Sequence, residues 1–150
     1  MKYIFPAAAL TLDRVLKHKA RAQQLPKTPC SHLAFHHVEN DGLAGSTLRT
    51  HPTLVKWLPC AALAANVPAL LHGFRKQRKI TKCGITLLLA GSASNVYDRL
   101  KNGTVTDMLR FPKAPGRLKT LVFNVADFMI FLGSLLTLFT FSCRSKKEKQ

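Results

Sequence analysis

Two acidic residues, Asp107 and Asp127, lie before and at the start of a strongly apolar stretch of the sequence, where a carboxylate is unusual. Asp127 closes the segment FNVAD (residues 123–127) at the start of the most apolar run in the chain, and Asp107 precedes that run in the segment VTDM. An aspartate at mid-membrane costs about 2.5–3.5 kcal/mol on insertion scales, so Asp127 is expected to face the interior of a helical bundle and to find polar partners there. Such an acid is a candidate functional residue.

Two carboxylates placed close together favour acid and base chemistry. Both cannot ionise comfortably, so one holds a proton while the other acts as a base, as the hydrolysis of an amide by activated water requires. The alternative is that a membrane aspartate pairs with a cation and only locks helices together. That alternative is favoured for Asp98, which is followed by Arg99 and lies near Arg110, and it is disfavoured for Asp107 and Asp127, which have no adjacent cation.

Helical spacing predicts polar partners for these acids. Asn124 and Asp127 are three residues apart and would share one face of a helix, and Asn95 would share a face with both Asp98 and Arg99. Asp127 is expected about eight residues, roughly 12 Å, below the outer start of the last helix. The acids should therefore converge just under one surface of the bundle.

The net charge of +16 comes from 23 Lys and Arg against seven acidic residues. A basic excess of this size indicates phosphate groups nearby, either of nucleic acid or of anionic lipid. Apolar blocks interrupt the basic residues, which favours lipid. A small basic nucleic-acid-binding protein is the alternative, and such a protein would be soluble without detergent.

Hydropathy predicts an all-α membrane protein with four transmembrane helices in one domain, residues 1–150. A single run, from about 120 to 143, has the roughly 20 apolar residues that a spanning helix requires. Three shorter runs could each be a buried soluble helix, and the first could be a secretory signal. The predicted spans are about 3–17, 54–74, 80–98 and 118–142.

Basic segments predict the orientation. The loop 75–79 and the tail 143–150 are rich in Lys and Arg and are expected on the cytoplasmic side. Both termini would then be cytoplasmic, and the longer loops 18–53 and 99–117 would face outward.

The cysteines show no metal-binding or disulfide spacing and are interpreted as small buried thiols. They are Cys30, Cys60, Cys83 and Cys143. A zinc site would need help from histidines, whose spacing fits no usual ligand pattern. These are His32, His36, His37 and His51.

Five ordered motifs resemble those of the lipoprotein signal peptidase (signal peptidase II) family. The pattern G-x-A-x-N-x-x-D-R is matched by residues 91–99, V-V-D-F is similar to residues 105–108, and F-N-x-A-D is matched at every fixed position by residues 123–127. Weaker similarities are L-D-x-x-S-K at residues 12–17 and N-x-G-A-A-F-S at residues 40–46. Their order and approximate spacing agree over almost the whole chain.

The resemblance implies a function and roles for named residues. Asp107 and Asp127 would be the catalytic pair of a membrane aspartyl endopeptidase that cuts prolipoproteins just before a diacylglyceryl-modified cysteine, without metal or cofactor. The residues that would bind or support the substrate are Asn40, Gly42, Asn95, Asp98, Arg99 and Asn124. Asp13 and Lys17 would be structural residues of the first helix.

The resemblance also implies a setting. The fold would be four transmembrane helices with a small extracytoplasmic β-cradle in the first loop. The protein would lie in the bacterial inner membrane as a monomer, with its active site toward the extracytoplasmic face. Its partners would be lipid-modified prolipoproteins and membrane phospholipid, and not nucleic acid.

Three positions depart from the family pattern. Ser92 and Ser94 replace glycines, and Gly45 replaces a phenylalanine of the cradle motif. Larger residues at helix contacts and a lost aromatic are expected to change the grip on the substrate more than the chemistry. A catalytically altered or inactive scaffold of the same fold is the alternative function.

Overall fold

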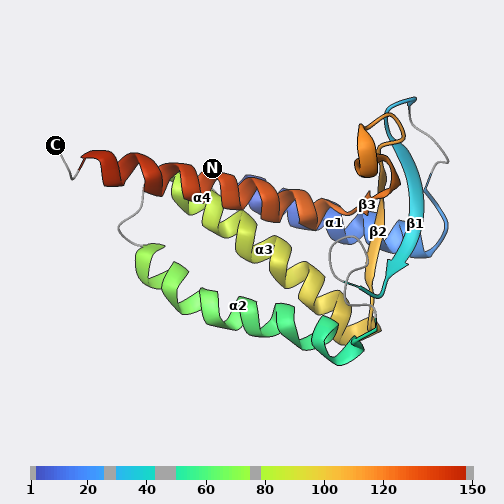
Figure 1. Ribbon diagram of the computed structural model, residues 1–150, viewed down its shortest axis with the longest axis horizontal. Coiled ribbons are helices and arrows are strands. Elements are labelled where there is room, and N and C mark those ends of the chain that lie inside the picture. The colour runs from blue at the N-terminus through green and yellow to red at the C-terminus, as the bar shows by residue number, and fades with distance from the viewer. Residues whose placement is uncertain (1–2, 26–29, 43–49, 75–78, 148–150) are drawn as a thin grey trace.

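The computed structural model describes residues 3–25, 30–42, 50–74 and 79–147. These residues form a helical bundle with a small sheet at one end (Figure 1). The helices are α1 (Ile4–Arg21), α2 (Pro52–Phe74), α3 (Lys79–Asn102) and α4 (Val125–Lys147), and the strands are β1 (Ala34–Asn40), β2 (Val105–Arg110) and β3 (Val122–Phe123). A short 3-10 helix, Gly116–Thr120, lies between β2 and β3.

Helices α3 and α4 pack so closely that only glycine fits at their contacts. A Cβ atom built on Gly133 would lie 2.6 Å from the carbonyl oxygen of Gly84 and 2.6 Å from the amide nitrogen of Leu88. A Cβ atom on Gly91 would lie 2.6 Å from the carbonyl oxygen of Ala126. Small residues allow this approach of two backbones. Helix α1 packs on both α3 and α4, and α2 packs on α3.

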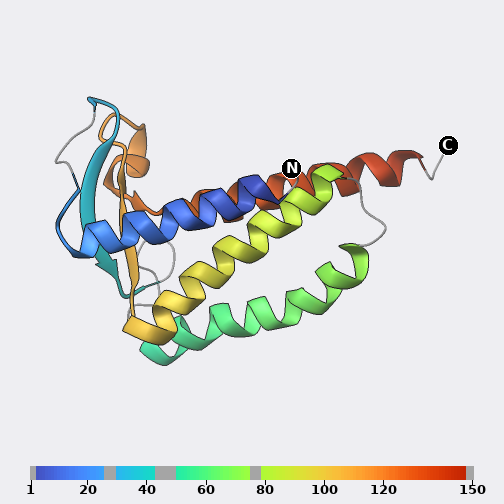
Figure 2. The ribbon, with the colours of Figure 1, turned by 180° about the vertical axis from the view of Figure 1, so that it is seen from behind.

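The sheet crosses the end of the bundle, as the two opposite views show (Figures 1 and 2). Its strands are antiparallel in the order β1-β2-β3, with Val38 opposite Asp107 and Leu109 opposite Phe123. The resemblance implied a cradle built from the first loop alone. The structure instead draws one strand from the first loop, one from the second, and one from the residues just before α4.

Four helix boundaries lie four or more residues from the predicted spans: the ends of α1, α3 and α4 and the start of α4. Helix α1 continues to Arg21, because Ala20 is buried against the bundle and Arg21 pairs with Glu39 of β1. Helix α4 begins at Val125 rather than near residue 118, because Val122 and Phe123 pair with β2. Hydropathy could not separate this short apolar strand from the helix that follows it.

Large apolar side chains are exposed on the outside of the helices. Phe5, Trp57, Phe131 and Phe139 are 57%, 56%, 66% and 71% exposed. Within the described parts of the chain, no helix combines the length and the mean hydropathy that identify a membrane span. Residues 75–78 and 148–150, which belong to the segments used to predict orientation, lie outside the described residues.

Candidate active site

Asn124 and Asp127 form a reciprocal cap at the start of α4. The backbone N–H of Asn124 donates to Asp127 Oδ2 at 3.0 Å, and the backbone N–H of Asp127 donates to Asn124 Oδ1 at 2.9 Å. This is the hydrogen-bond pattern of a capping box, with the N-cap residue and the third helical residue each satisfying the other. The prediction that Asp127 lies about eight residues inside the last helix is therefore wrong, because Asp127 lies in the first turn of α4.

Asp107 is brought to the same place by β2. Its carboxylate is 4% exposed, and its two oxygens accept hydrogen bonds from Asn124 Nδ2 at 2.7 Å and from Asn40 Nδ2 at 2.9 Å. Burial raises the pKa of Asp107 to about 6, and the negative charge of Asp127 adds to this rise against the lowering effect of the two amides. Asn124 therefore contacts both acids, one through its side chain and one through its backbone.

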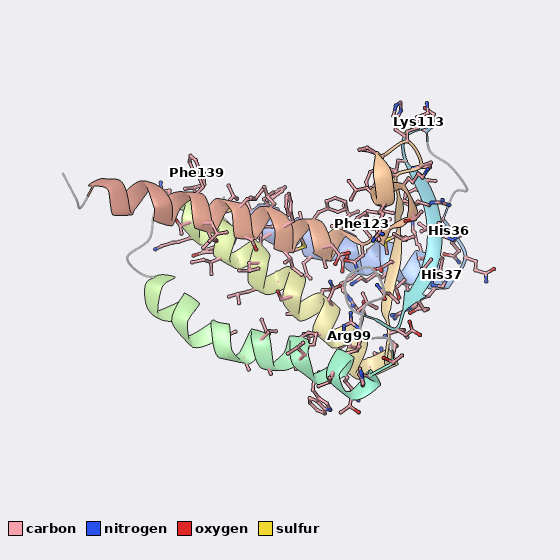
Figure 3. All side chains as sticks on the ribbon, in the orientation of Figure 1. His36, His37, Arg99, Lys113, Phe123 and Phe139 are labelled. Atoms are coloured by element: carbon pink, nitrogen blue, oxygen red, sulfur yellow. The ribbon has the colours of Figure 1, made fainter. Side chains whose placement is uncertain are left out.

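Helix α3 supplies two more groups to the acids. Asn95 Nδ2 donates to Asp127 Oδ1 at 2.9 Å. Arg99 is buried, donates from Nη2 to the carbonyl oxygen of Gly42 at 2.9 Å, and interacts electrostatically with both Asp107 and Asp127. Figure 3 shows Arg99 at the end of α3 that meets the sheet.

A cavity of about 1170 Å³ opens beside the two acids. Its polar end is lined by Asn40, Asn95, Arg99, Asp107 and Asp127. Its apolar walls come from α2, α3 and α4 and include Pro59, Leu63, Leu88, Leu89, Ile130 and Phe131. A long apolar ligand whose polar part reaches the acids would fit this distribution of side chains.

Asp98 does not line this cavity. Its carboxylate is fully buried and forms ion pairs with Arg14 at 2.7 Å and with Lys17 at 2.8 Å. The expectation that Asp98 serves an ion pair agrees with these contacts, but the partners expected for it, Arg99 and Arg110, are wrong. Successive helical residues point about 100° apart, so Asp98 faces α1 while Arg99 faces the cavity.

Asp13 connects α1 to the start of α4. Its Oδ1 accepts a hydrogen bond from the backbone N–H of Ala126 at 2.9 Å, and its Oδ2 accepts one from Ser94 Oγ at 2.6 Å. Ser94, one of the departures from glycine, is thus accommodated as a donor to a buried carboxylate. Ser92, the other serine, lines the cavity. Gly45 lies outside the described residues.

The histidines and cysteines do not assemble into a metal site within the described part of the chain. His37 Nε2 lies 3.0 Å from Glu39 Oε1. Cys30, Cys60 and Cys83 are free thiols, but the expectation that they are buried is wrong, because Cys30 is exposed and the other two are half-buried. The side chain of Cys143 is outside what the structure describes.

Sequence reasoning missed Arg14, Arg21 and Ser94 as partners of the buried acids. The spacing of Asp13, Lys17 and Arg21 at intervals of four places them on one face of a helix, which could have indicated an inward polar face.

A helical bundle closed at one end by a three-stranded sheet, with the buried Asp107 and the half-buried Asp127 beside an apolar cavity, defines a class of helical proteins with an acid pair at the mouth of such a cavity. The chain belongs to the signal peptidase II family: the profile described as "Signal peptidase (SPase) II" matches residues 5–143. This is a family of proteases of lipoprotein processing.

Similar proteins agree with this assignment. The chain is 29% identical over 128 residues to the "Lipoprotein signal peptidase" of Yersinia pseudotuberculosis serotype O:1b (strain IP 31758), which covers 83% of this chain and 73% of that protein. The corresponding protein of Yersinia pestis (strain Pestoides F) gives the same values.

Two solved structures share the fold, and both are described as bacterial membrane enzyme structures determined by the in meso method. The one at 2.3 Å resolution has a TM-score of 0.76 at 21% identity and covers 99% of this chain and 91% of its own. The one at 1.9 Å resolution has a TM-score of 0.69 at 22% identity, with coverage of 92% and 90%.

Proposed function

We propose that this protein is an aspartyl endopeptidase of the membrane that removes signal peptides from diacylglyceryl-modified prolipoproteins, cutting just before the lipidated cysteine. The observation that supports this most directly is the contact of Asn124 with both Asp107 and Asp127 at the mouth of an apolar cavity. The relatives named lipoprotein signal peptidases support prolipoproteins as the class of substrate.

In the proposed mechanism the two acids divide the proton transfers. Asp127 takes a proton from a water molecule as that water attacks the scissile carbonyl, while protonated Asp107 donates its proton to the carbonyl oxygen. The tetrahedral intermediate then returns that proton to Asp107, and the proton held by Asp127 moves to the amine of the cysteine as the bond breaks. Asn40, Asn95 and Asn124 hold the carboxylates in place, and Arg99 holds Gly42 beside them through its carbonyl oxygen.

The same proposal places the four helices across the bacterial inner membrane. Exposed Phe, Leu and Trp side chains on their outer surfaces would face lipid, where they need no protein partner. The apolar walls of the cavity would receive the signal peptide and the acyl chains, and the sheet end would face away from the cytoplasm. The protein would act as a monomer, and neither metal nor cofactor enters the mechanism.

The direct test is incubation of the purified protein with a diacylglyceryl-modified prolipoprotein. Mass spectrometry is expected to show one new amino terminus at the lipidated cysteine. The unmodified precursor, which lacks the acyl chains, serves as the control and is expected to be cut far more slowly. Absence of cleavage of the lipidated substrate would instead support the inactive scaffold of the same fold.

The pKa of Asp107 predicts how cleavage depends on pH. Because the proton on Asp107 is lost near pH 6 in the free enzyme, kcat/KM is expected to fall about tenfold per pH unit above that value as the pair becomes doubly ionised. A bound apolar substrate excludes water from the site, so the corresponding fall in kcat should begin at higher pH. Rate measurements from pH 5 to 9 would show both the fall in kcat/KM and the later fall in kcat. A flat kcat/KM profile would contradict the role given to Asp107.

A further inference from the structure

Lys17 places an ammonium group inside the bundle. The residue is 1% exposed, and the proposed hydrolysis does not use it directly. It forms ion pairs with Asp13 at 3.0 Å and with Asp98 at 2.8 Å. It also donates a hydrogen bond to Asn95 Oδ1 at 2.9 Å. Asn95 donates in turn to Asp127, so a chain of two hydrogen bonds through Asn95 connects Lys17 to a proposed catalytic carboxylate.

Two of the three asparagines at the site are held by the backbone. The Asn40 amide oxygen accepts from the N–H of Gly42 at 3.0 Å, and the Asn124 amide oxygen accepts from the N–H of Asp127 at 2.9 Å. In both cases the oxygen is occupied, so the NH₂ group must point at Asp107. A side-chain amide that turned by 180° would place its oxygen against a carboxylate, which is repulsive.

The third asparagine is oriented differently. The oxygen of Asn95 has the ammonium of Lys17 as its donor, in place of a backbone N–H. An ammonium group has three donors and no acceptor, so it can face only the oxygen of an amide. The ammonium group of Lys17 therefore fixes the orientation of the Asn95 amide, with its oxygen toward Lys17 and its NH₂ group toward Asp127.

We infer that Lys17 is a positioning residue of the active site, which fixes the amide of Asn95 so that its Nδ2 group holds the carboxylate of Asp127. This inference rests on the proposed function, since it assigns Lys17 a part in the same reaction. Asp13 and Asp98 pair with the ammonium group of Lys17 in the bundle interior, and Asp98 also pairs with Arg14 at 2.7 Å. The rival role is purely structural, in which Lys17 only ties α1 to α3.

The two roles differ in what a compensated variant recovers. Lys17→Met alone leaves Asp13 buried without its ammonium partner and is expected to be less stable. In the double variant Asp13→Asn, Lys17→Met, the asparagine oxygen can still accept from Ala126 and its NH₂ group can donate to Ser94 Oγ, so the thermal stability should return. Asp98 keeps its pairing with Arg14, and the Asn95 amide still lacks its donor.

We expect both variants to lose kcat by about 10–100-fold, the effect of a small misplacement of a catalytic group, with KM changed less than about threefold. The exposed Lys19→Met on the same helix serves as the control and should cleave like the wild type. Recovery of kcat together with thermal stability in the double variant would overturn the inference in favour of the structural role.

A second measurement does not depend on cleavage. Nuclear magnetic resonance of the side-chain NH₂ of Asn95, identified by its absence in Asn95→Asp, should show a protected and shifted group in the wild type that becomes averaged in the double variant. An unchanged Asn95 signal would refute the positioning role even if the wild type cleaved no prolipoprotein. Failure of wild-type cleavage with a changed signal would reject the proposed function and retain the orientation of Asn95 by Lys17.

Discussion

Asp107→Asn and Asp127→Asn are each expected to lower kcat for a lipidated prolipoprotein by about 10²–10⁴-fold, the range that a positioned acid or base contributes. An asparagine can neither take a proton from water nor give one to the carbonyl. The loss should appear in kcat rather than in KM, because the apolar walls of the cavity remain intact. Single-turnover cleavage followed by mass spectrometry would measure it.

The two variants should remain folded, which keeps the result interpretable. In Asp107→Asn, the new NH₂ group faces the NH₂ group of either Asn40 or Asn124, so one hydrogen bond is lost. This loss lowers the free energy of unfolding by about 1–2 kcal/mol, and removal of a buried charge offsets it. Glu39→Gln is the matched control, an acid of the sheet that lies outside the cavity. Cleavage at the wild-type rate by either aspartate variant would remove the acid pair from the mechanism.

Gly133→Ala is expected to destabilise the protein by about 3 kcal/mol, the upper part of the range for overpacking a core. The added methyl group would meet the carbonyl oxygen of Gly84 and the amide nitrogen of Leu88 at 2.6 Å, and neither backbone atom can move aside alone. Helices α3 and α4 must then separate. Thermal unfolding in detergent would measure the change.

Gly91→Ala should act on the site as well as on stability. Its methyl group would press on the carbonyl oxygen of Ala126 at 2.6 Å, in the turn that contains Asp127. Activity is therefore expected to fall further than the folded fraction. Leu135→Ala, at a position 48% exposed on α4, is the control and should change neither property strongly. An unfolding temperature for both glycine variants equal to that of the control would contradict the close packing of α3 and α4.

Sequence alone predicted the helical nature of the fold and named acids and asparagines that the structure brings together, but it did not predict their geometry. The apolar run before and within α4 has no periodicity that separates Val122 and Phe123, which pair across the sheet, from the helix that begins at Val125. Val122 and Phe123 form a strand because they pair with β2, and the hydropathy of their own segment carries no information about that partner. Spacing alone therefore predicts that Asp127 lies well inside the helix, where the structure instead has the reciprocal cap with Asn124.

Contacts between helices were beyond sequence reasoning for a similar reason. Spacing within one helix places Asp98 and Arg99 on different faces, but only the packing of α1 against α3 decides that Asp98 meets Arg14 and Lys17. The positions of Asn40 and Gly42 followed from family resemblance alone. Nothing local in that segment indicates that the Asn40 amide reaches Asp107 across the β1–β2 pair.

The sheet has a consequence for biosynthesis. Its first strand precedes α2, and its last strand, together with Asp127, is translated only after α1, α2 and α3. A nascent chain on the ribosome thus lacks Asp127, the reciprocal cap and one edge strand of the sheet until all three of these helices have been made.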